Sequence, residues 1–390
     1  MEIKILNIAT ILPFPKMEGE YKLKENDFLI ILQKYLVSKK IDVNFVKISI
    51  WSNKIFARLS KKWDAYYKIP ENYYVDGNRI NVIKRIAFPK DKLKILSYIL
   101  TLMLNMRKLD KIAKSNYTCS HAHYLLIDGY FSYYLYKRFN LPYVLTVRDE
   151  TNKFKSMFLK GIAHRVLDNA RYIITTNGVN EAKLKKFTDK DINIITHGVD
   201  VENFWYNSSV NDTIQIITVC KLDKGKRIDI LLDALRKIKN IDYVLNIIGN
   251  GPEYDYLSLI SEGVKCKFWG ELKHEEVILH LKESDVFVLP SESESFGSVY
   301  IEALASSNAV IAVEGTGVYG LFEAEKEILY MKNNSVDSLY EILKDLLSNK
   351  TKIKNLKENG FRSVKDNYTW EHISDEYYKI YKEISDEQNT

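Results

Sequence analysis

The sequence is poor in cysteine. Only three of its 390 residues are cysteines (Cys119, Cys220 and Cys266), and no two of them form a C-x-x-C pair. Disulfide-stabilised secreted domains and zinc modules need closely spaced cysteines, so the sequence offers neither a disulfide framework nor a zinc site. Cysteines spaced this widely fit a protein that stays in a reducing interior.

Long hydrophobic runs are also missing. The longest, residues 95–106, covers 12 residues and is interrupted by Ser97, Thr101 and Asn105. A membrane-spanning helix needs about 20 apolar residues, so this run is too short. Basic residues flank it on both sides, and such a helix can lie on an anionic membrane surface. A core helix with solvated ends is the alternative. Residues 1–6 indicate a first β-strand and not a signal peptide.

Acidic residues are scarce in the first half of the chain. Residues 1–200 hold 35 Lys+Arg against 19 Asp+Glu, a net charge of +16, whereas residues 201–390 hold 22 against 32, a net of −10. The two halves therefore face different partners, or the first faces an anionic surface. A solvated lysine-rich surface would give the same counts. Nucleic-acid binding is not expected, because no recognisable nucleic-acid motif is present.

The length and the hydrophobic pattern predict two α/β domains. A chain of 390 residues exceeds what one core usually supports. In both halves, short apolar runs alternate with stretches of helical periodicity, which predicts parallel sheets with helices on their faces. The strand candidates are residues 3–8, 43–46, 143–147, 172–176, 214–219, 243–248, 285–289 and 309–313; the helix candidates include 27–38, 229–238 and 298–305. Residues 197–200 and the polar stretch 207–212 form the expected linker.

The most informative segment is residues 290–305. A predicted strand ends just before it, an acidic and hydroxyl-rich loop follows, and a helix begins near Gly297. Free N–H groups and the dipole of a helix start attract anions, and Gly297 lets a phosphate approach. Glu302, in that helix, can lean back toward its start, where a carboxylate suits the hydroxyls of a ribose. Glu294 in the loop is placed to meet a sugar hydroxyl.

Glu294 and Glu302 are separated by seven residues, with Phe296, Gly297 and Ser298 between them. This segment resembles the E-x7-E signature of the retaining glycosyltransferases of family four, which have the GT-B fold. The resemblance implies a catalytic role for Glu294. It implies donor binding by Phe296, Gly297, Ser298 and Glu302. It covers nearly the whole chain and is most specific over residues 214–314. Two glutamates at this spacing alone would more often be a solvated helix face.

Further donor-site residues follow from the same resemblance. Lys221 and Lys226 stand where the family stabilises the leaving diphosphate, so we expect both to be catalytic. Lys221 replaces the usual Arg and Arg227 the usual Gly, so Arg227 is a candidate to share this task. Gly249 and Gly251 match the family's G-x-G-P turn near the nucleotide. A solvated basic turn is the alternative for the lysines.

The first half carries weaker counterparts. Residues 121–129 resemble the family's H-x-H…D-G stretch, which implies that His123 is catalytic and lies at the cleft. A structural histidine is the alternative. Arg148 and Asp149 follow a strand at the position of a glycine-bearing turn in the family. Gly19 is the remaining glycine of the loop that closes over donor and acceptor in relatives. These last three residues are candidates for acceptor contacts.

The resemblance implies two Rossmann-like domains facing a central cleft. We expect an acceptor-binding domain at 1–203, a nucleotide-sugar-binding domain at 204–367, and a helix at 368–390 that returns to the first domain. No metal and no cofactor are expected, because lysines and a helix start replace the cation. The one D-x-D match, residues 189–191, lies in a lysine-rich segment.

The resemblance implies a nucleotide-sugar donor with uridine as the expected base and guanosine as the next candidate. The basic first half, the 27 tyrosines and residues 90–114 suggest a glycan or lipid-linked glycan acceptor. The hypothesis is therefore bacterial cell-surface polysaccharide synthesis by a cytoplasmic protein that contacts the inner face of the cell membrane. Two alternatives stay open at this point: a sugar-nucleotide epimerase on the same fold, and a catalytically inactive nucleotide-sugar-binding protein.

Overall fold

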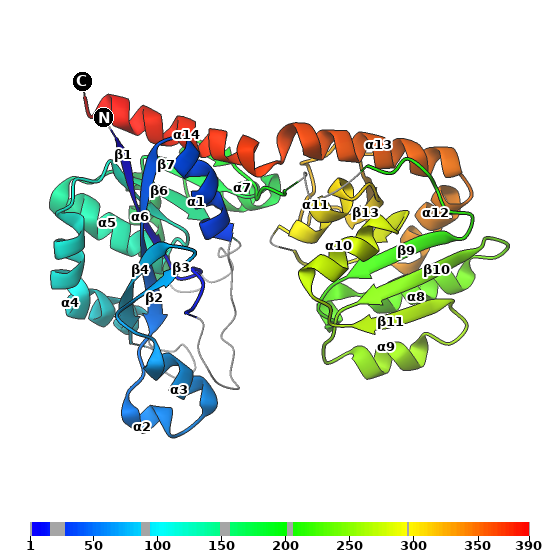
Figure 1. The fold of residues 1–390 in the computed structure, drawn as a ribbon, viewed down its shortest axis with the longest axis horizontal. Coiled ribbons are helices and arrows are strands. Elements are labelled where there is room, and N and C mark those ends of the chain that lie inside the picture. Colours follow the sequence, from blue (N-terminus) through cyan, green and yellow to red (C-terminus); the bar gives the residue numbers. More distant parts are fainter. Residues whose placement is uncertain are drawn as a thin grey trace. The chain divides into compact units, whose positions relative to one another are not determined.

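The computed structural model describes residues 2–15, 28–86, 94–148, 157–200, 206–294 and 296–389. Two compact units make up the chain (Figure 1). The first comprises residues 1–175, 181–195 and 374–390, and the second comprises residues 176–180 and 196–373. Each unit has its own parallel sheet with helices on its faces, so the α/β class predicted from the hydrophobic pattern is confirmed.

The first unit is built on an eight-stranded sheet with the order β3-β4-β2-β1-β5-β6-β7-β8. Neighbouring strands are parallel except for the antiparallel pair β3–β4. Every residue of β6 is buried, as expected for a strand covered on both faces. The strands are β1 Ile3–Ala9, β2 Ile41–Ile50, β3 Asn72–Val75, β4 Asn78–Arg85, β5 Cys119–Ala122, β6 Tyr143–Val147, β7 Tyr172–Thr175 and β8 Ile192–Ile194.

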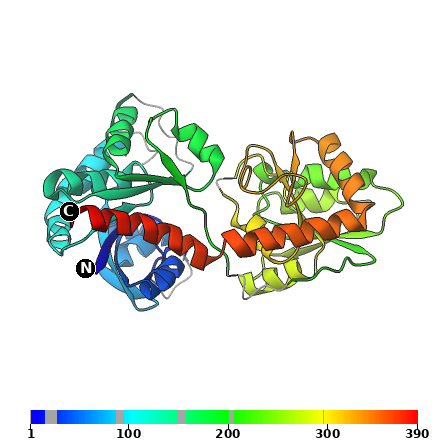
Figure 2. The ribbon, with the colours of Figure 1, turned by 90° about the horizontal axis from the view of Figure 1, so that it is seen from above.

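The helices around this sheet are α1 Phe28–Ser38, α2 Lys54–Ala57, α3 Lys61–Lys68, α4 Lys94–Ala113, α5 Ile127–Phe139, α6 Met157–Asn169 and most of α7 Gly178–Leu184. Helix α14 (Trp370–Glu387, red in Figure 2) packs on the same unit from its residue Ser374 onward. Its Tyr381 hydroxyl lies 2.6 Å from the Nδ1 atom of the buried His121 on β5. The chain's last helix therefore completes the core of the first unit.

The second unit has a six-stranded, fully parallel sheet with the order β11-β10-β9-β12-β13-β14. Its strands are β9 Ile214–Val219, β10 Tyr243–Ile248, β11 Cys266–Gly270, β12 Val286–Val288, β13 Ala309–Val313 and β14 Leu329–Met331. Its helices are α8 Ile228–Lys237, α9 Tyr254–Ile260, α10 His274–Lys282, α11 Ser298–Ala305, α12 Val336–Leu347 and α13 Lys350–Asn367. Branched apolar residues fill these strands, so each strand appears in the sequence as a short apolar run.

In each unit the strand order reverses once, between β1 and β5 and between β9 and β12. The loops at the carboxyl ends of these strands part in opposite directions, and open α/β sheets bind their ligands at such a point. The loops are those after Ala9 and Ala122 in the first unit, and those after Val219 and Val288 in the second. Most of the predicted site residues lie in these loops.

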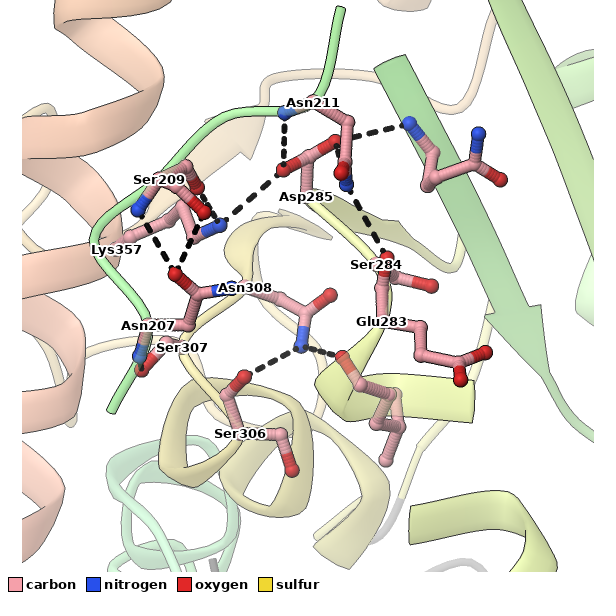
Figure 3. Close-up of polar contacts among 12 residues, drawn as sticks. Asn207, Ser209, Asn211, Glu283, Ser284, Asp285, Ser306, Ser307, Asn308 and Lys357 are labelled. Carbon is pink, nitrogen blue, oxygen red and sulfur yellow. Dashed lines mark hydrogen bonds and ion pairs between the residues drawn. The ribbon is translucent and has the colours of Figure 1, made fainter. Parts of the chain in front are cut away.

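The opposite end of the second sheet is held by a buried ion pair (Figure 3). Asp285, just before β12, accepts hydrogen bonds from the backbone N of Gln215 and the side chain of Asn211, both at 3.0 Å. The Lys357 Nζ atom of α13 lies 3.2 Å from the same carboxylate and donates to the Ser209 carbonyl at 2.6 Å. This network fixes the start of the second unit against its sheet and leaves the carboxyl end of the sheet for the site.

Candidate active site

The loop after β9 brings cations to the switch point of the second unit. A short 3-10 turn, Lys224–Lys226, leads into α8, and the backbone N of Lys226 donates to the Asp223 carbonyl at 3.0 Å. Arg227 joins the turn to the helix with φ 51° and ψ 42°, a left-handed conformation that glycine adopts without steric cost. This geometry explains why a glycine suits the position, and why an arginine here is unusual.

The Gly249–Gly251 turn supports that loop by close backbone contact. The Leu222 backbone N donates to the Asn250 carbonyl at 3.0 Å. A Cβ atom on Gly249 would lie 1.8 Å from the Cys220 carbonyl oxygen, and one on Gly251 would lie 2.2 Å from that of Leu222. Any side chain at these two positions would push the loop away from the turn. The structure therefore gives both glycines a packing role in the site.

Lys226 meets Glu294, which comes from the loop after β12. The Lys226 ammonium donates to Glu294 Oε1, and both side chains are largely buried. Next to this pair, the Arg227 guanidinium lies 2.7 Å from the Glu292 carboxylate and 3.1 Å from that of Asp229. Two cations and three carboxylates therefore gather where the strand order reverses.

Lys221 differs from the other two cations. Its side chain is exposed and makes no hydrogen bond or ion pair with the described residues of the chain. The loop thus holds Lys226 and Arg227 in ion pairs, while Lys221 extends into solvent beside them.

Backbone contacts hold the loop after β12 in position. The Glu292 backbone N donates to the Gly225 carbonyl at 2.9 Å, which ties this loop to the turn after β9. The Gly317 backbone N donates to the Glu294 carbonyl at 3.1 Å, and the Asn177 side chain donates to the Gly317 carbonyl at 2.8 Å. Glu294 is therefore supported from three segments that are far apart in the sequence.

Gly297 ends this loop and starts α11, as the sequence predicted. Its φ of +76° is left-handed, and a Cβ atom there would lie 2.7 Å from the ring of the buried Tyr300. Phe296 is buried, and the His197 ring packs against it with the ring centres 5.0 Å apart. Ser298 is the first residue of α11. Gly297 therefore has no side chain that would keep an anion away from the start of α11.

Glu302 lies just over one turn into α11, and its Oε1 atom is 3.4 Å from the Nε2 atom of His274. The hydrogen bond to this carboxylate raises the pKa of His274 above its ordinary value. Sequence reasoning missed His274, because a lone histidine at the start of an exposed helix carries no motif. It also missed Asn177 and Gly317, although the two glycines of Gly315-Thr316-Gly317 after β13 are a usable signal for a tight loop.

A pocket of 610 Å³ opens beside the ion pairs. Arg227 and Glu292 line it together with Asp223, Lys224 and Tyr256, whereas Lys226, Glu294 and Glu302 do not. Ligand pockets commonly occupy 300–1,000 Å³, so there is room for a ligand group on the outer side of Arg227.

In the first unit, His123 follows β5 directly at the reversal of strand order. It is fully buried, and its ring stacks on that of His121 with the ring centres 4.2 Å apart. The Nε2 atom of His121 lies 2.8 Å from the Thr146 hydroxyl. Burial, with a smaller effect of the nearby Arg148, lowers the pKa of His121 to about 3, so its ring is neutral at physiological pH.

Arg148 follows β6, and its guanidinium lies 4.4 Å from the centre of the Phe28 ring. In the same unit, Asp128 of α5 accepts a hydrogen bond from the Thr10 backbone N at 3.1 Å. Lys47, buried on β2, donates to the Thr10 carbonyl at 3.2 Å, and burial lowers its pKa to about 7. Sequence reasoning missed Lys47, since a lysine within a strand is normally taken as a solvent-facing residue.

Two of the predicted acceptor-side residues, Gly19 and Asp149, lie outside the described residues. In the described part of the chain, no three His, Cys, Asp or Glu side chains come together as metal ligands would. None of its helices combines the length and the apolar character that crossing a bilayer requires.

Comparison with known sequences identifies the second unit. Residues 201–363 match the family described as "Glycosyl transferases group 1". A glycosyltransferase of Methanocaldococcus jannaschii is 26% identical over 80% of this chain and 88% of its own length. The alpha-monoglucosyldiacylglycerol synthase of Acholeplasma laidlawii is 24% identical over 78% of this chain and 84% of its own.

Solved structures share the fold of both units. The sucrose-phosphate synthase of Thermosynechococcus elongatus superposes with a TM-score of 0.75 and 19% identity, over 98% of this chain and 99% of that one. The Anabaena protein HepE, solved in complex with UDP-glucose, superposes with a TM-score of 0.65 and 15% identity, over 97% of this chain and 99% of that one. These likenesses confirm the GT-B fold predicted from the E-x7-E segment.

Proposed function

Because the chain is a glycosyltransferase with a glycosyl transferases group 1 domain at residues 201–363, we propose that it transfers a sugar from a nucleotide-diphosphate-sugar with retention at the anomeric carbon. The observation that carries the proposal is the contact between Lys226 and Glu294 at the reversal of strand order. It joins a cation for the leaving phosphate to a carboxylate for the sugar, beside the start of a helix.

Lys226 and the start of α11 receive the diphosphate of the donor. Without a donor, the charge of Lys226 is balanced by Glu294. A diphosphate competes for the same ammonium, which releases the Glu294 carboxylate to accept hydrogen bonds from the hydroxyls of the donor sugar. As the glycosidic bond breaks, negative charge grows on the phosphate, and Lys226 stabilises it where it develops.

Arg227 and Lys221 complete the cationic side of the site. Arg227 turns from Glu292 and Asp229 toward the phosphates, and the exposed Lys221 closes over them from solvent. With these positive charges the proposal needs no metal and no other cofactor.

Glu302 takes the ribose of the donor, and His274 orients its carboxylate. Uridine is the proposed base, in keeping with the UDP-glucose complex of the structurally similar Anabaena protein. Gly249 and Gly251 hold the loop that faces the nucleotide through the packing contacts described above.

The first unit takes the acceptor, which we assign as a glycan or lipid-linked glycan of bacterial cell-surface polysaccharide synthesis. The proposed acceptor contacts are Arg148, Gly19 and Asp149, and the buried His123 keeps the catalytic role that the resemblance implies. A related sequence is named for the synthesis of a glycolipid, which supports a lipid-linked acceptor. Helix α4 exposes Leu96, Met103 and Leu104 near basic residues, so the proposal places the protein in the cytoplasm at the inner face of the cell membrane.

The test is thermal unfolding with a panel of nucleotide-sugars, followed by turnover. A donor at about 100 times its Kd should stabilise the protein by about 2.7 kcal/mol, and Glu302→Ala should abolish the shift. With a lipid-linked glycan mixture, Lys226→Ala should lower the release of nucleoside diphosphate by about 100-fold or more, whereas Lys239→Ala, at an exposed position after α8, should not. An isomerised nucleotide-sugar formed without acceptor would refute transfer and establish an epimerase.

A further inference from the structure

We infer that helices α2 and α3 form a docking surface for an anionic lipid bilayer. The inference rests on the proposed function, because a lipid-linked acceptor lies in a membrane, and it adds to the contact of α4 a second one made by another part of the first unit. We call residues 51–68 the tip. Figure 1 shows it projecting from the sheet beyond the end of β2.

The tip exposes apolar side chains that a soluble helix would bury. None of the four residues of α2 is buried. Ile55 is 72% exposed and Leu59 is 68% exposed, and three aromatic residues of the tip or its base are also exposed: Trp51, Phe56 and Tyr67. Isolated exposed apolar residues are common, but five within 17 residues of one helical hairpin form a patch that calls for a partner.

The surroundings of these apolar residues are basic. The tip contains Lys54, Arg58, Lys61, Lys62 and Lys68, and all five are exposed. Its single acid, Asp64, is in an ion pair with Lys68 at 2.7 Å. Cations that surround exposed apolar and aromatic side chains suit the boundary between lipid headgroups and acyl chains. The same charge would disfavour the interface of two identical copies, which would bring like charges together.

The tip is an ordered structure and not a loose loop. Asn53 caps α2 by accepting hydrogen bonds from the backbone N atoms of Ile55 and Phe56, both at 2.9 Å. The Ser60 hydroxyl caps α3 by accepting from the backbone N of Trp63 at 3.3 Å. Buried Ala65 anchors α3 to the unit. Apolar side chains held outward on capped helices are already arranged for contact with a partner.

A line of aromatic rings connects the tip with the proposed acceptor side of the first unit. The ring centres of Phe56 and Trp63 are 5.8 Å apart, those of Trp63 and Tyr66 6.3 Å, and those of Tyr66 and Phe14 6.1 Å. Phe14 lies in the loop after β1, where the strand order reverses. A bilayer that binds the tip would therefore present a lipid-linked acceptor close to this loop.

Sedimentation with vesicles tests the inference. The probes are vesicles of phosphatidylcholine alone and of phosphatidylcholine with phosphatidylglycerol. We expect binding to the anionic vesicles, which Ile55→Glu/Leu59→Glu lowers by about tenfold or more. Arg58→Glu/Lys62→Glu should lower it similarly, because each cation near an anionic surface strengthens binding by about fivefold. The matched control is Leu259→Glu on α9, since Leu259 is 77% exposed and belongs to the second unit.

Other outcomes would overturn the inference. Equal binding of the wild type and both tip variants would refute it, and so would loss of binding in Met103→Glu/Leu104→Glu alone, which would assign the contact to α4. Loss of self-association in the tip variants, measured by light scattering, without loss of vesicle binding would identify a second copy as the partner. All variants should keep the melting shift with nucleotide-sugar. If the wild type binds vesicles but no nucleotide-sugar, the proposed function fails and the docking surface stands.

Discussion

Replacing Arg227 by glycine and, separately, by alanine distinguishes the role of its backbone from that of its side chain. Its φ of 51° is left-handed, which costs a residue with a Cβ atom about 1–2 kcal/mol. Alanine keeps this cost and loses the ion pairs with Asp229 and Glu292, which are partly exposed and contribute up to about 1 kcal/mol each. We therefore expect Arg227→Ala to destabilise the protein by about 1–2 kcal/mol.

Glycine loses the same ion pairs but removes the backbone strain. Its greater freedom in the unfolded chain costs about 0.5–1 kcal/mol. Arg227→Gly should therefore be more stable than Arg227→Ala, by about 0.5–1 kcal/mol. Urea unfolding with a common m-value would measure this difference. A glycine variant less stable than the alanine variant would refute the argument that strain at residue 227 matters.

Nucleotide binding by the same two variants tests the side chain. If the guanidinium contacts the diphosphate, both variants should lose about tenfold or more in affinity for UDP, because hydrogen bonds to charged groups contribute about 1.5–3 kcal/mol. Calorimetric titration would measure this loss. Unchanged affinity in both variants would mean that Arg227 only balances Glu292 and Asp229, and Lys221 would then be the second phosphate ligand.

Three further predictions concern stability. Lys357→Met should lower the free energy of unfolding in urea by about 3 kcal/mol. This is the lower end for a broken buried ion pair, because Asp285 still accepts hydrogen bonds from Asn211 and Gln215. The double variant Asp285→Asn/Lys357→Met should recover part of the lost stability. Gly249→Ala should lower the free energy of unfolding by more than about 2 kcal/mol, because its Cβ atom would meet the Cys220 carbonyl. In the control Gly225→Ala the Cβ atom has only an ordinary contact at 3.5 Å, so the free energy of unfolding should change by no more than about 0.5 kcal/mol. His274 has a raised pKa, so its contact with Glu302 stabilises the fold fully below about pH 6.5, and this contribution is lost as the pH rises through the folded pKa. His274→Ala should therefore lower the melting temperature at pH 5.5 more than at pH 9; an equal loss at both would show that the contact is not ionic.

Eight of the fourteen strands in the described part of the chain are expected from the sequence, because nearly all strand pairs in the two sheets are parallel and the central strands are covered on two faces. Strands such as β6 are therefore continuous apolar runs, and α8 and α11 begin within two residues of their expected starts. The donor loops are predictable for a related reason. Lys226 and Glu294 each lie in the loop that follows a strand, and adjacent parallel strands bring their carboxyl ends to one edge.

Other parts of the site could not be predicted, because they depend on contacts between distant segments. Asn177 supports Glu294 through the Gly317 carbonyl, and three separate stretches of sequence meet there. Lys47 is buried because the loop after β1 folds back over β2 and offers it the carbonyls of Thr10 and Leu12. Neither residue stands in a local pattern that would distinguish it from an ordinary surface side chain.

The same sheet architecture places very different chemistry in the two units. At the reversal in the second unit, Lys226 and Arg227 each have a carboxylate partner, and under the proposed mechanism phosphates replace those partners. At the reversal in the first unit, burial lowers the pKa of Lys47 to about 7 and that of His121 to about 3, so the charge of these groups is reduced. Under the proposed function, the buried imidazole and aromatic rings of the first unit suit an acceptor hydroxyl, whereas the ion pairs of the second unit suit a diphosphate. The topology therefore decides where each site forms, and the partners of its buried charges decide what the site binds.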